Sequence, residues 1–337
     1  MTRPTPVHDL SAATISLAGD SSAPLAVAVR HPDGTWETAG HPVGAQAQRY
    51  EIGSVTKAVT GVLLGVLAEA GDIDPLQPID DVLGAPLPWR DTPLGRPRLI
   101  DAATHHTGLP NTLPRVRWRE AAVALGISTR DPWRDIDTAE FLAGRRECIS
   151  RARPRRSFAY SSLGVGLLGD ALSAAMGAGS YARLLRERVL MPLGMDRTGA
   201  DRPAQSADRV TVGRNRRERP TPYLKDHMPA AGMLATDVAD LRRLVDAAFG
   251  DGPSDIGAGM RASLQTRVEL SKGFGVGYCW FIDHRRESPV IHHDGGTWGS
   301  QAHLSLSPDT GRAVVALSAK YRPLTRLADR IHRAASR

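Results

Sequence analysis

The stretch Ser54-Val55-Thr56-Lys57 (SVTK) leads into an apolar run, KAVTGVLLGVLAEAG, that extends from Lys57 to Gly71. Apolar residues recur through this run at helical spacing and also occupy its other faces, which predicts a helix buried on nearly all sides and ended by Gly71. Residues three apart share a helix face, so the Lys57 amine can reach the Ser54 hydroxyl. Burial favours the uncharged amine of a lysine, which can activate a serine nucleophile.

A simple helix cap is the alternative interpretation of Ser54. A capping box would place Glu or Gln at position 57, where this sequence has Lys. No other lysine of the chain has a serine three residues before it. A helix N-terminus also favours negative charge developing on the serine oxygen. The tetrapeptide is therefore a candidate nucleophile site.

Two later stretches carry polar residues next to predicted elements. Tyr160-Ser161-Ser162 precedes the helical run LGVGLLGDALSAAMG, where a serine could simply cap the helix and Tyr160 pack against it. Residues 293–299, His-Asp-Gly-Gly-Thr-Trp-Gly, precede a predicted strand, and a glycine-rich strand edge permits close backbone approach to a ligand. A plain turn is the alternative there. No metal site is expected, because His292 and His293 would point to opposite sides of a strand and no carboxylate–histidine spacing accompanies them.

The predicted strands lie towards the two ends of the chain, and predicted helices lie between them. Leu25–Arg30 and Thr35–Thr38 form a hairpin around Pro32-Asp33-Gly34. Further strands are expected at 277–283, 302–307 and 313–319, the last two joined by a turn at 308–311, and helices at 137–146, 163–176, 179–190 and 323–335. This order predicts an α/β (α+β) protein. A sheet domain made of residues 1–82 and 225–337 is interrupted by a mostly helical domain, residues 83–224.

The composition excludes several classes of protein. With 337 residues and 41% hydrophobic residues, the chain can bury a substantial core. Its net charge is +7, but only four of the 43 basic residues are lysines, and the arginines are scattered apart from stretches at 151–156 and 214–219. No helix-turn-helix, zinc-finger or ribonucleoprotein pattern is present, so no nucleic-acid partner is expected.

Cysteine content and hydropathy predict the compartment. Cys148 and Cys279 are too few for a disulfide framework or a thiolate metal site. Nowhere do about 18 apolar residues run together, so no membrane partner is expected. The first thirty residues contain no apolar core of secretory type, which predicts a cytoplasmic protein.

Together, in this order, the three stretches resemble the superfamily of serine β-lactamases and penicillin-binding proteins. The similarity is greatest to the branch of class C β-lactamase-related esterases, D-aminopeptidases and transacylases. The family motifs Ser-x-x-Lys, Tyr-x-Asn (or Ser) and Lys-Thr-Gly (or His-x-Gly) match Ser54/Lys57, Tyr160/Ser162 and His293/Gly295. Further similar stretches lie at 104–110, 192–195, 230–245 and 273–280, and the resemblance covers about residues 25–320.

This resemblance implies a β-lactamase/transpeptidase-like fold, in which an antiparallel sheet flanked by helices meets a mostly helical region and the site lies between them. It implies that Ser54 is the nucleophile of an acyl-enzyme, and that Lys57 and Tyr160 share the proton transfers, with the identity of the general base left open. Ser162 is expected to hydrogen-bond to Lys57 or to the substrate. No cofactor is implied.

The third motif is expected to supply the substrate-facing backbone. The N–H groups of Ser54 and Gly296 should form the oxyanion hole, in which one donor is typically worth about 10²–10³ in rate. His293, Gly295 and Trp298 are expected to line the substrate site beside them.

Two departures from the family pattern bear on the activity. His293 stands where many relatives have lysine, so a fixed positive charge for a β-lactam carboxylate is missing, and Ser162 stands where others have asparagine. The sequence therefore favours an esterase, amidase or transacylase acting on a small acyl substrate, in a biosynthetic role if an amine or alcohol accepts the acyl group. A β-lactamase or D,D-peptidase is one alternative, and a non-catalytic binding protein is another. Hydrolysis and transfer are not distinguished.

The arginine-rich stretch Arg214–Arg219 allows two interpretations. It could be a solvated loop, or it could bind an anionic substrate through guanidinium groups.

Overall fold

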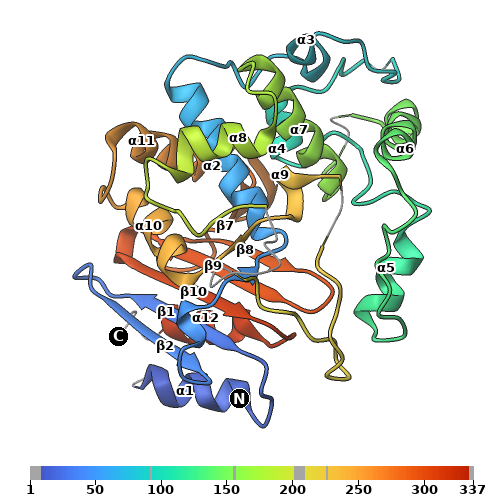
Figure 1. Ribbon diagram of the computed structural model, residues 1–337. Coiled ribbons are helices and arrows are strands. Elements are labelled where there is room, and N and C mark those ends of the chain that lie inside the picture. Colours follow the sequence, from blue (N-terminus) through green and yellow to red (C-terminus); the bar gives the residue numbers. More distant parts are fainter. Residues whose placement is uncertain (1–8, 92, 155–156, 201–208, 225–226, 334–337) are drawn as a thin grey trace.

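The computed structural model describes residues 9–91, 93–154, 157–200, 209–224 and 227–333 (Figure 1). Among these residues, an eight-stranded antiparallel sheet crosses the molecule in the order β2-β1-β10-β9-β8-β7-β6-β5. The strands are β1 (Leu25–Arg30), β2 (Trp36–His41), β5 (Val268–Ser271), β6 (Phe274–Val276), β7 (Phe281–Asp283), β8 (Val290–Gly296), β9 (Gln301–Ser307) and β10 (Arg312–Ser318). Because β1 pairs with β10, the two ends of the chain build one sheet, as the sequence predicts. A short pair, β3 (Tyr50–Glu51) and β4 (Ala235–Thr236), lies apart from it.

The two faces of the sheet pack against different helices. β1 shows this clearly, since Ala26 and Ala28 belong to the larger hydrophobic cluster while Val27 and Val29 belong to the smaller one. This alternation is the period of two expected of a strand buried on both faces. The helices that pack on the side of the smaller cluster are α1 (Leu10–Ala18) and α12 (Leu324–Arg333).

The helix predicted after Lys57 is the centre of the larger cluster. It is α2 (Val55–Glu69), whose residues 55–67 are all buried, and Gly71 follows its end with a φ of 76°. α11 (Ser254–Ser263) packs against α2, and α10 (Val238–Ala248) packs against α11 and the sheet. The prediction of a helix buried on all sides is therefore confirmed.

The middle of the chain forms a helical group above α2 and to its right (Figure 1). Its elements are α3 (Ile79–Leu83), α4 (Leu99–Ala103), α5 (Arg117–Ala124), α6 (Thr138–Arg151), α7 (Ser162–Ala175), α8 (Tyr181–Leu185), a π-helical turn (Arg186–Leu190) and α9 (Pro229–Gly232). One hydrophobic cluster runs from Leu304 in the sheet through Leu63 of α2 to Leu167 of α7. The domain boundaries expected at 82/83 and 224/225 stay a prediction.

The predicted strand at 277–283 is wrong over its first half. Only Phe281–Asp283 are extended, and residues 277–280 form a tight turn between β6 and β7, closed by Gly277 N donating to Trp280 O at 2.8 Å. Cys279 has a φ of 62° in this turn, and its N–H donates to the Ala103 carbonyl. Contacts with distant backbone therefore override an apolar pattern that resembles a strand. The other predicted strands, and the helices centred on α6, α7 and α12, are confirmed with shifted ends.

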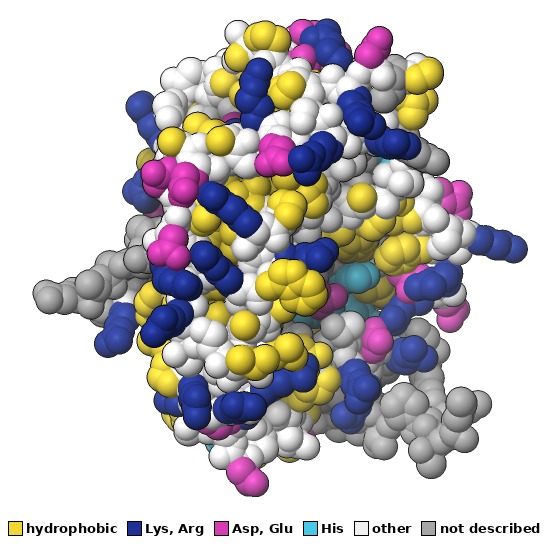
Figure 2. All heavy atoms as spheres, turned by 90° about the vertical axis from the view of Figure 1, so that its right-hand side faces the viewer, with side chains coloured by type: hydrophobic (Ala, Val, Ile, Leu, Met, Phe, Trp, Pro, Cys, Tyr) yellow, Lys and Arg dark blue, Asp and Glu magenta, His cyan; other side chains and the backbone are white. Residues whose placement is uncertain are grey.

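No helix in the described part of the chain is both long and apolar enough to cross a membrane. On the face shown in Figure 2, the Lys and Arg side chains are dispersed among other residues and do not gather in one patch.

Candidate active site

Ser54 and Lys57 meet at the first turn of α2. The Lys57 amine donates to Ser54 Oγ at 3.0 Å and to the Ala231 carbonyl at 2.7 Å, and the Lys57 residue is completely buried. Ser54 occupies the N-cap position, but its side chain makes no capping hydrogen bond. Among the described residues, no carboxylate forms an ion pair with Lys57. The cap interpretation therefore does not explain Ser54, and a buried amine is left to interact with its hydroxyl.

The strand β8 approaches the start of α2 so closely that only glycine fits at two positions. A Cβ on Gly295 would lie 1.9 Å from the Ile52 carbonyl oxygen, and a Cβ on Gly53 would lie 2.4 Å from the Gly296 carbonyl oxygen. Gly53 also has a φ of 48°, which L-residues rarely adopt. The backbone of Gly296 is thereby held beside the backbone of Ser54.

The register of β8 leaves the Gly296 N–H directed away from β9. Thr297 N donates to Ser300 O at 3.0 Å, and Gly296 is paired with Gln301. Antiparallel pairs alternate between hydrogen-bonded and non-bonded, so the Gly296–Gln301 pair is of the non-bonded type. The Gly296 N–H and the Ser54 N–H at the helix N-terminus are thus both available to one acceptor, as an oxyanion hole requires.

The stretch 293–299 precedes the strand β9, as the sequence predicts, and its first residues, which include His293, Gly295 and Gly296, form the end of β8. His293 Nδ1 donates to its neighbour's carbonyl, Asp294 O, at 2.7 Å. Burial, reinforced by the nearby Lys57 charge, lowers the pKa of His293 to about 3. His293 is therefore neutral at physiological pH and supplies no fixed positive charge.

Tyr160 lies between aromatic rings beside the amine. The Lys57 amine lies 5.0 Å from the centroid of the Tyr160 ring. The same ring lies 4.4 Å from that of His105 and 6.3 Å from those of Phe281 and His293. Within the described part of the chain, the Tyr160 hydroxyl makes no hydrogen bond, so it stays available to a substrate or to Lys57. Hydrogen bonds of this kind often form only once a substrate is bound.

Of the two partners expected for Ser162, Lys57 is not hydrogen-bonded to it among the described residues, because the Lys57 amine donates to Ser54 and Ala231. Its hydroxyl and its backbone N–H both donate to Asn111 Oδ1, at 2.8 and 3.1 Å. The neighbouring Ser161 caps α7, accepting from Gly164 N at 2.8 Å. Ser162 nevertheless lines the same cavity as Ser54, so the expected contact with a substrate stays a prediction.

The cavity at Ser54 is small, with a volume of about 120 Å³. Its lining residues are Gly53, Ser54, Asn111, Thr112, Glu120, Ser162, Leu224, Met228, Ala231, Gly232, Gly296, Thr297 and Trp298. Trp298 and Gly296 therefore line the same cavity as Ser54, whereas Gly295 lines the adjoining cavity and His293 lines neither. Figure 2 shows histidine side chains at the bottom of a hollow on this side of the molecule.

Glu120 is one of the lining residues that the sequence analysis misses. It lies on α5, and its Oε1 accepts from Trp133 Nε1 at 3.0 Å and from Thr112 Oγ1 at 3.3 Å. Burial raises the pKa of Glu120, while these two donors oppose the shift. Nothing in the local sequence REAAVALG marks this glutamate, because only the tertiary fold brings α5 to the Ser54 cavity.

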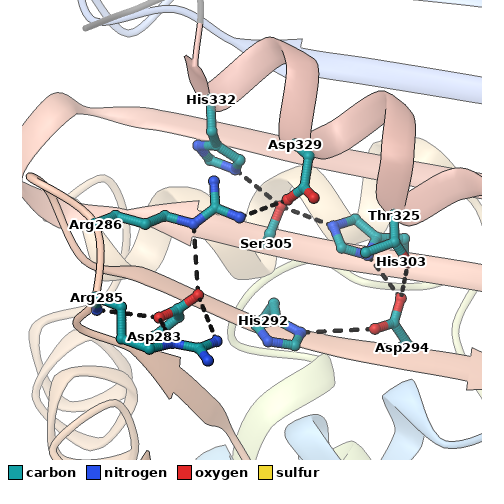
Figure 3. Close-up of polar contacts among 10 residues, drawn as sticks. All are labelled: Asp283, Arg285, Arg286, His292, Asp294, His303, Ser305, Thr325, Asp329 and His332. Carbon is teal, nitrogen blue, oxygen red and sulfur yellow. Dashed lines mark hydrogen bonds and ion pairs between the residues drawn. The ribbon is translucent and has the colours of Figure 1, made fainter. Parts of the chain in front are cut away.

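A polar network holds β8 from the opposite face of the sheet (Figure 3). Asp294 Oδ1 interacts with His303 Nδ1 at 2.8 Å and accepts from Thr325 of α12 at 3.0 Å. His303 Nε2 lies 2.9 Å from Ser305 Oγ, which lies 2.9 Å from His332 Nε2. Ser305 is only 1% exposed beneath α12, so no substrate can reach its hydroxyl. The network therefore ties β8, β9 and α12 together and is not a second nucleophile site.

The charged residues of the network have shifted pKa values. Burial alone would raise the pKa of Asp294, but its contacts with His292 and His303 lower it below the usual range. Burial lowers the pKa of His332 to about 3, and the nearby His303 and Arg286 charges add to the effect. Arg286 in turn donates to Asp329 at 2.6 Å (Figure 3). The described residues contain no cluster of three His, Cys, Asp or Glu that could hold a metal ion.

The arginines of the stretch 214–219 differ in whether they line a cavity. Arg214 and Arg216 line a neighbouring cavity of about 410 Å³, which shares Gly296, Thr297 and Trp298 with the Ser54 cavity. Arg217 and Arg219 are exposed and do not line it.

Part of the sequence is similar to that of a human protein. A human beta-lactamase-like protein is 33% identical over 171 residues, which are 49% of this chain and 34% of the human protein. The match therefore spans about a third of the length of that relative.

Solved structures from three organisms share the architecture. A class C β-lactamase from Rhodobacter sphaeroides has a TM-score of 0.73 at 20% identity, covering 96% of this chain and 97% of that one. An octameric penicillin-binding protein homologue from Pyrococcus abyssi has a TM-score of 0.78 at 22% identity, covering 96% and 76%. A D-alanine carboxypeptidase from Burkholderia cenocepacia has a TM-score of 0.73 at 18% identity, covering 97% of both chains.

At these identities the structural likeness establishes the fold, which is β-lactamase/transpeptidase-like. The family model described as Beta-lactamase matches residues 17–337, nearly the whole chain. The protein belongs to the Beta-lactamase family, within the superfamily of serine β-lactamases and penicillin-binding proteins.

Proposed function

We propose that this protein is a serine acyl-transfer enzyme that forms an acyl-enzyme on Ser54 from a small ester or amide. The observation that supports this most strongly is the fully buried Lys57 amine, which lies 3.0 Å from Ser54 Oγ. A lysine amine at hydrogen-bond distance from a serine hydroxyl can act as the general base that accepts the serine proton.

Acylation begins when Ser54 Oγ attacks the carbonyl carbon of the substrate and its proton passes to Lys57, directly or through Tyr160. The negative charge on the carbonyl oxygen is stabilised by the N–H groups of Ser54 and Gly296. The bond to the leaving group then breaks as that group takes up the proton. Water, an amine or an alcohol next attacks the Ser54 ester, and the proton returns to Ser54.

Features around the site favour small substrates without a β-lactam carboxylate. The cavity at Ser54 holds only about 120 Å³. The residue in the third motif is a neutral, buried His293, so no fixed cation is provided at that position. A β-lactamase or D,D-peptidase is the second candidate, because the same fold is found in class C β-lactamases and in a D-alanine carboxypeptidase.

Stopped-flow measurement of p-nitrophenol release from p-nitrophenyl acetate tests the proposal. We expect a burst of one equivalent per enzyme molecule, which Ser54→Ala abolishes, followed by slower turnover. Added amines or alcohols that accelerate the slow phase and yield acylated products indicate transfer, whereas unchanged rates indicate hydrolysis. Turnover of nitrocefin as efficient as that of simple esters at pH 7.5 favours the second candidate. Absence of any reaction by the folded protein over a panel of esters, amides and nitrocefin refutes both.

A further inference from the structure

The Ser54 cavity contains one negatively charged side chain that the proposed acyl transfer does not use. Glu120 is the only acidic residue among the described residues lining this cavity. It forms no ion pair with a described lysine, arginine or histidine, and its hydrogen bonds from Thr112 and Trp133 both go to Oε1. Oε2 therefore has no partner within the described part of the chain. This oxygen is free, among the described residues, to accept from a donor on a bound ligand.

The side chain of Glu120 is held in place by its neighbours. Trp133 belongs to the hydrophobic core at 3% exposure and offers a fixed indole N–H. Thr112 is 8% exposed and adds a second donor from the loop before α5. Since both donors act on the same oxygen, the carboxylate cannot turn away without losing two hydrogen bonds. Trp133 and Thr112, which take no part in the acyl transfer, therefore fix the position of the Glu120 carboxylate at the Ser54 cavity.

Ser162 adds a second acceptor to the same cavity. Asn111 Oδ1 accepts from the backbone N–H of Ser162, which can only donate, so the amide orientation of Asn111 is settled. The Ser162 hydroxyl must then be the donor in its own bond to Asn111 Oδ1. Its proton is committed, and its free lone pairs can only accept. Glu120 and Ser162 thus both present acceptors to whatever occupies the cavity.

We propose that Glu120 is a specificity-determining residue that binds a primary ammonium group on the acyl part of the substrate, so that the preferred substrates are aminoacyl esters or amides. An ammonium group carries three N–H donors and one positive charge, which match a carboxylate and a hydroxyl oxygen. This inference rests on the proposed acylation of Ser54.

The raised pKa of Glu120 agrees with this role and makes it testable. Burial raises the pKa of the empty site, and a bound ammonium group would lower it again by favouring the charged carboxylate. Preference for amine-bearing substrates should therefore fall at low pH, as Glu120 is protonated, and at high pH, as the substrate amine loses its proton.

The test compares substrates that differ only in the amine. For wild type and each variant, kcat/KM is measured with alanine p-nitroanilide, in both enantiomers, and with propionic acid p-nitroanilide. We expect wild type to prefer at least one alanine enantiomer by about tenfold or more, as is typical of a charge-assisted contact. In Glu120→Gln the ratio should fall to near one. Glu187→Gln, an exposed glutamate on the π-helical turn, is the matched control and should keep the wild-type ratio.

Trp133→Phe provides a second variant that retains the carboxylate. Loss of the indole N–H removes a donor that lowers the pKa of Glu120, so this carboxylate should be protonated at a higher pH. The fall of the kcat/KM ratio on the acidic side should therefore begin at a higher pH than in wild type. Labelling of Ser54 by a fluorophosphonate is measured for every variant, which separates loss of the amine contact from loss of acylation.

Equal kcat/KM values for the two substrate types in wild type would overturn the proposal, provided that Ser54 is acylated. An amine preference that survives Glu120→Gln would overturn it too. If wild type is not acylated at all, the failure lies with the proposed function and not with Glu120.

Discussion

His293 and Asp294 are consecutive residues of β8 whose side chains lie on opposite faces of the sheet. His293 packs beside Tyr160, with ring centroids 6.3 Å apart, while Asp294 lies 2.8 Å from His303 on the face covered by α12. The strand segment that ends at Gly296 is therefore held from both sides. This explains how a glycine-rich strand end can present a backbone N–H in a fixed position beside Ser54.

The close approach of β8 to α2 predicts different effects at two adjacent glycines. Gly295→Ala should destabilise the protein by about 3 kcal/mol or more, because the new methyl would lie 1.9 Å from the Ile52 carbonyl oxygen. Gly296→Ala should change stability by less than about 1 kcal/mol, since the nearest atom to its Cβ is 3.8 Å away. Urea unfolding of both variants checks this. Equal losses in the two variants would show that the contact with Ile52 does not constrain β8.

Lys57 and Tyr160 should behave as one unit in the proton transfers. Lys57→Ala and Tyr160→Phe should each lower kcat by about the same factor as the double variant, because residues that act together are strongly non-additive. The measurement is a double-mutant cycle on the acylation rate of an activated ester. Additive losses would mean that the two residues act separately. Tyr181→Phe, at a buried tyrosine bonded to Thr60 away from the Ser54 cavity, is a control for general loss of packing.

Two buried histidines predict a loss of stability in mild acid. The pKa values of His293 and His332 are lowered to about 3, mainly by burial. Below pH 6.5 the unfolded chain binds protons at these residues and the folded chain does not, so the free energy of unfolding falls as the pH falls from about 6.5 towards 3. Each residue should contribute a loss of about 2 kcal/mol between pH 7 and pH 5.

Urea unfolding of His332→Asn at these two pH values measures that contribution. The drop in stability between pH 7 and pH 5 should be about 2 kcal/mol smaller than in wild type. His284→Asn, at an exposed histidine, should leave the drop unchanged. A drop of wild-type size in His332→Asn would show that His332 binds protons equally well in both states.

The cavity lined by Arg214 and Arg216 predicts that salt changes KM for anionic substrates only. If Arg216 attracts anionic substrates, KM for 3-acetoxybenzoate should rise about two- to fivefold between 0.02 and 0.3 M NaCl, and KM for the neutral 3-acetoxybenzamide should not. Arg216→Ala should remove the salt response, whereas Arg217→Ala should keep it, because Arg217 lies outside the cavity. A response that is unchanged in both variants would leave the arginines as surface charge.

The sequence predicts best the features that depend on local spacing. Ser54 and Lys57 are one helical turn apart, so their contact follows once the helix is recognised. Strands predicted at both ends of the chain likewise indicate that the two ends share one sheet, whereas its antiparallel arrangement is implied only by the family resemblance. The turn at 277–280 could not be foreseen, because Cys279 is held there by a bond to the Ala103 carbonyl, far away in sequence.

The same reasoning explains which parts of the site are missed. Asn111 and Glu120 reach the cavity from a segment that is distant in sequence from both Ser54 and Ser162, and no motif marks either residue. The hydroxyl of Ser162 donates to Asn111 Oδ1, a bond that the sequence analysis does not predict.

The central claim is that Ser54 carries the acyl group, and intact-mass spectrometry after incubation with a fluorophosphonate tests it most directly. Peptide mapping should place a single adduct on Ser54. Ser54→Ala should show no adduct while unfolding at the wild-type urea concentration, because its side chain makes no capping bond that the fold requires. An adduct on another residue, or a folded wild-type protein that takes up no label, would contradict the account.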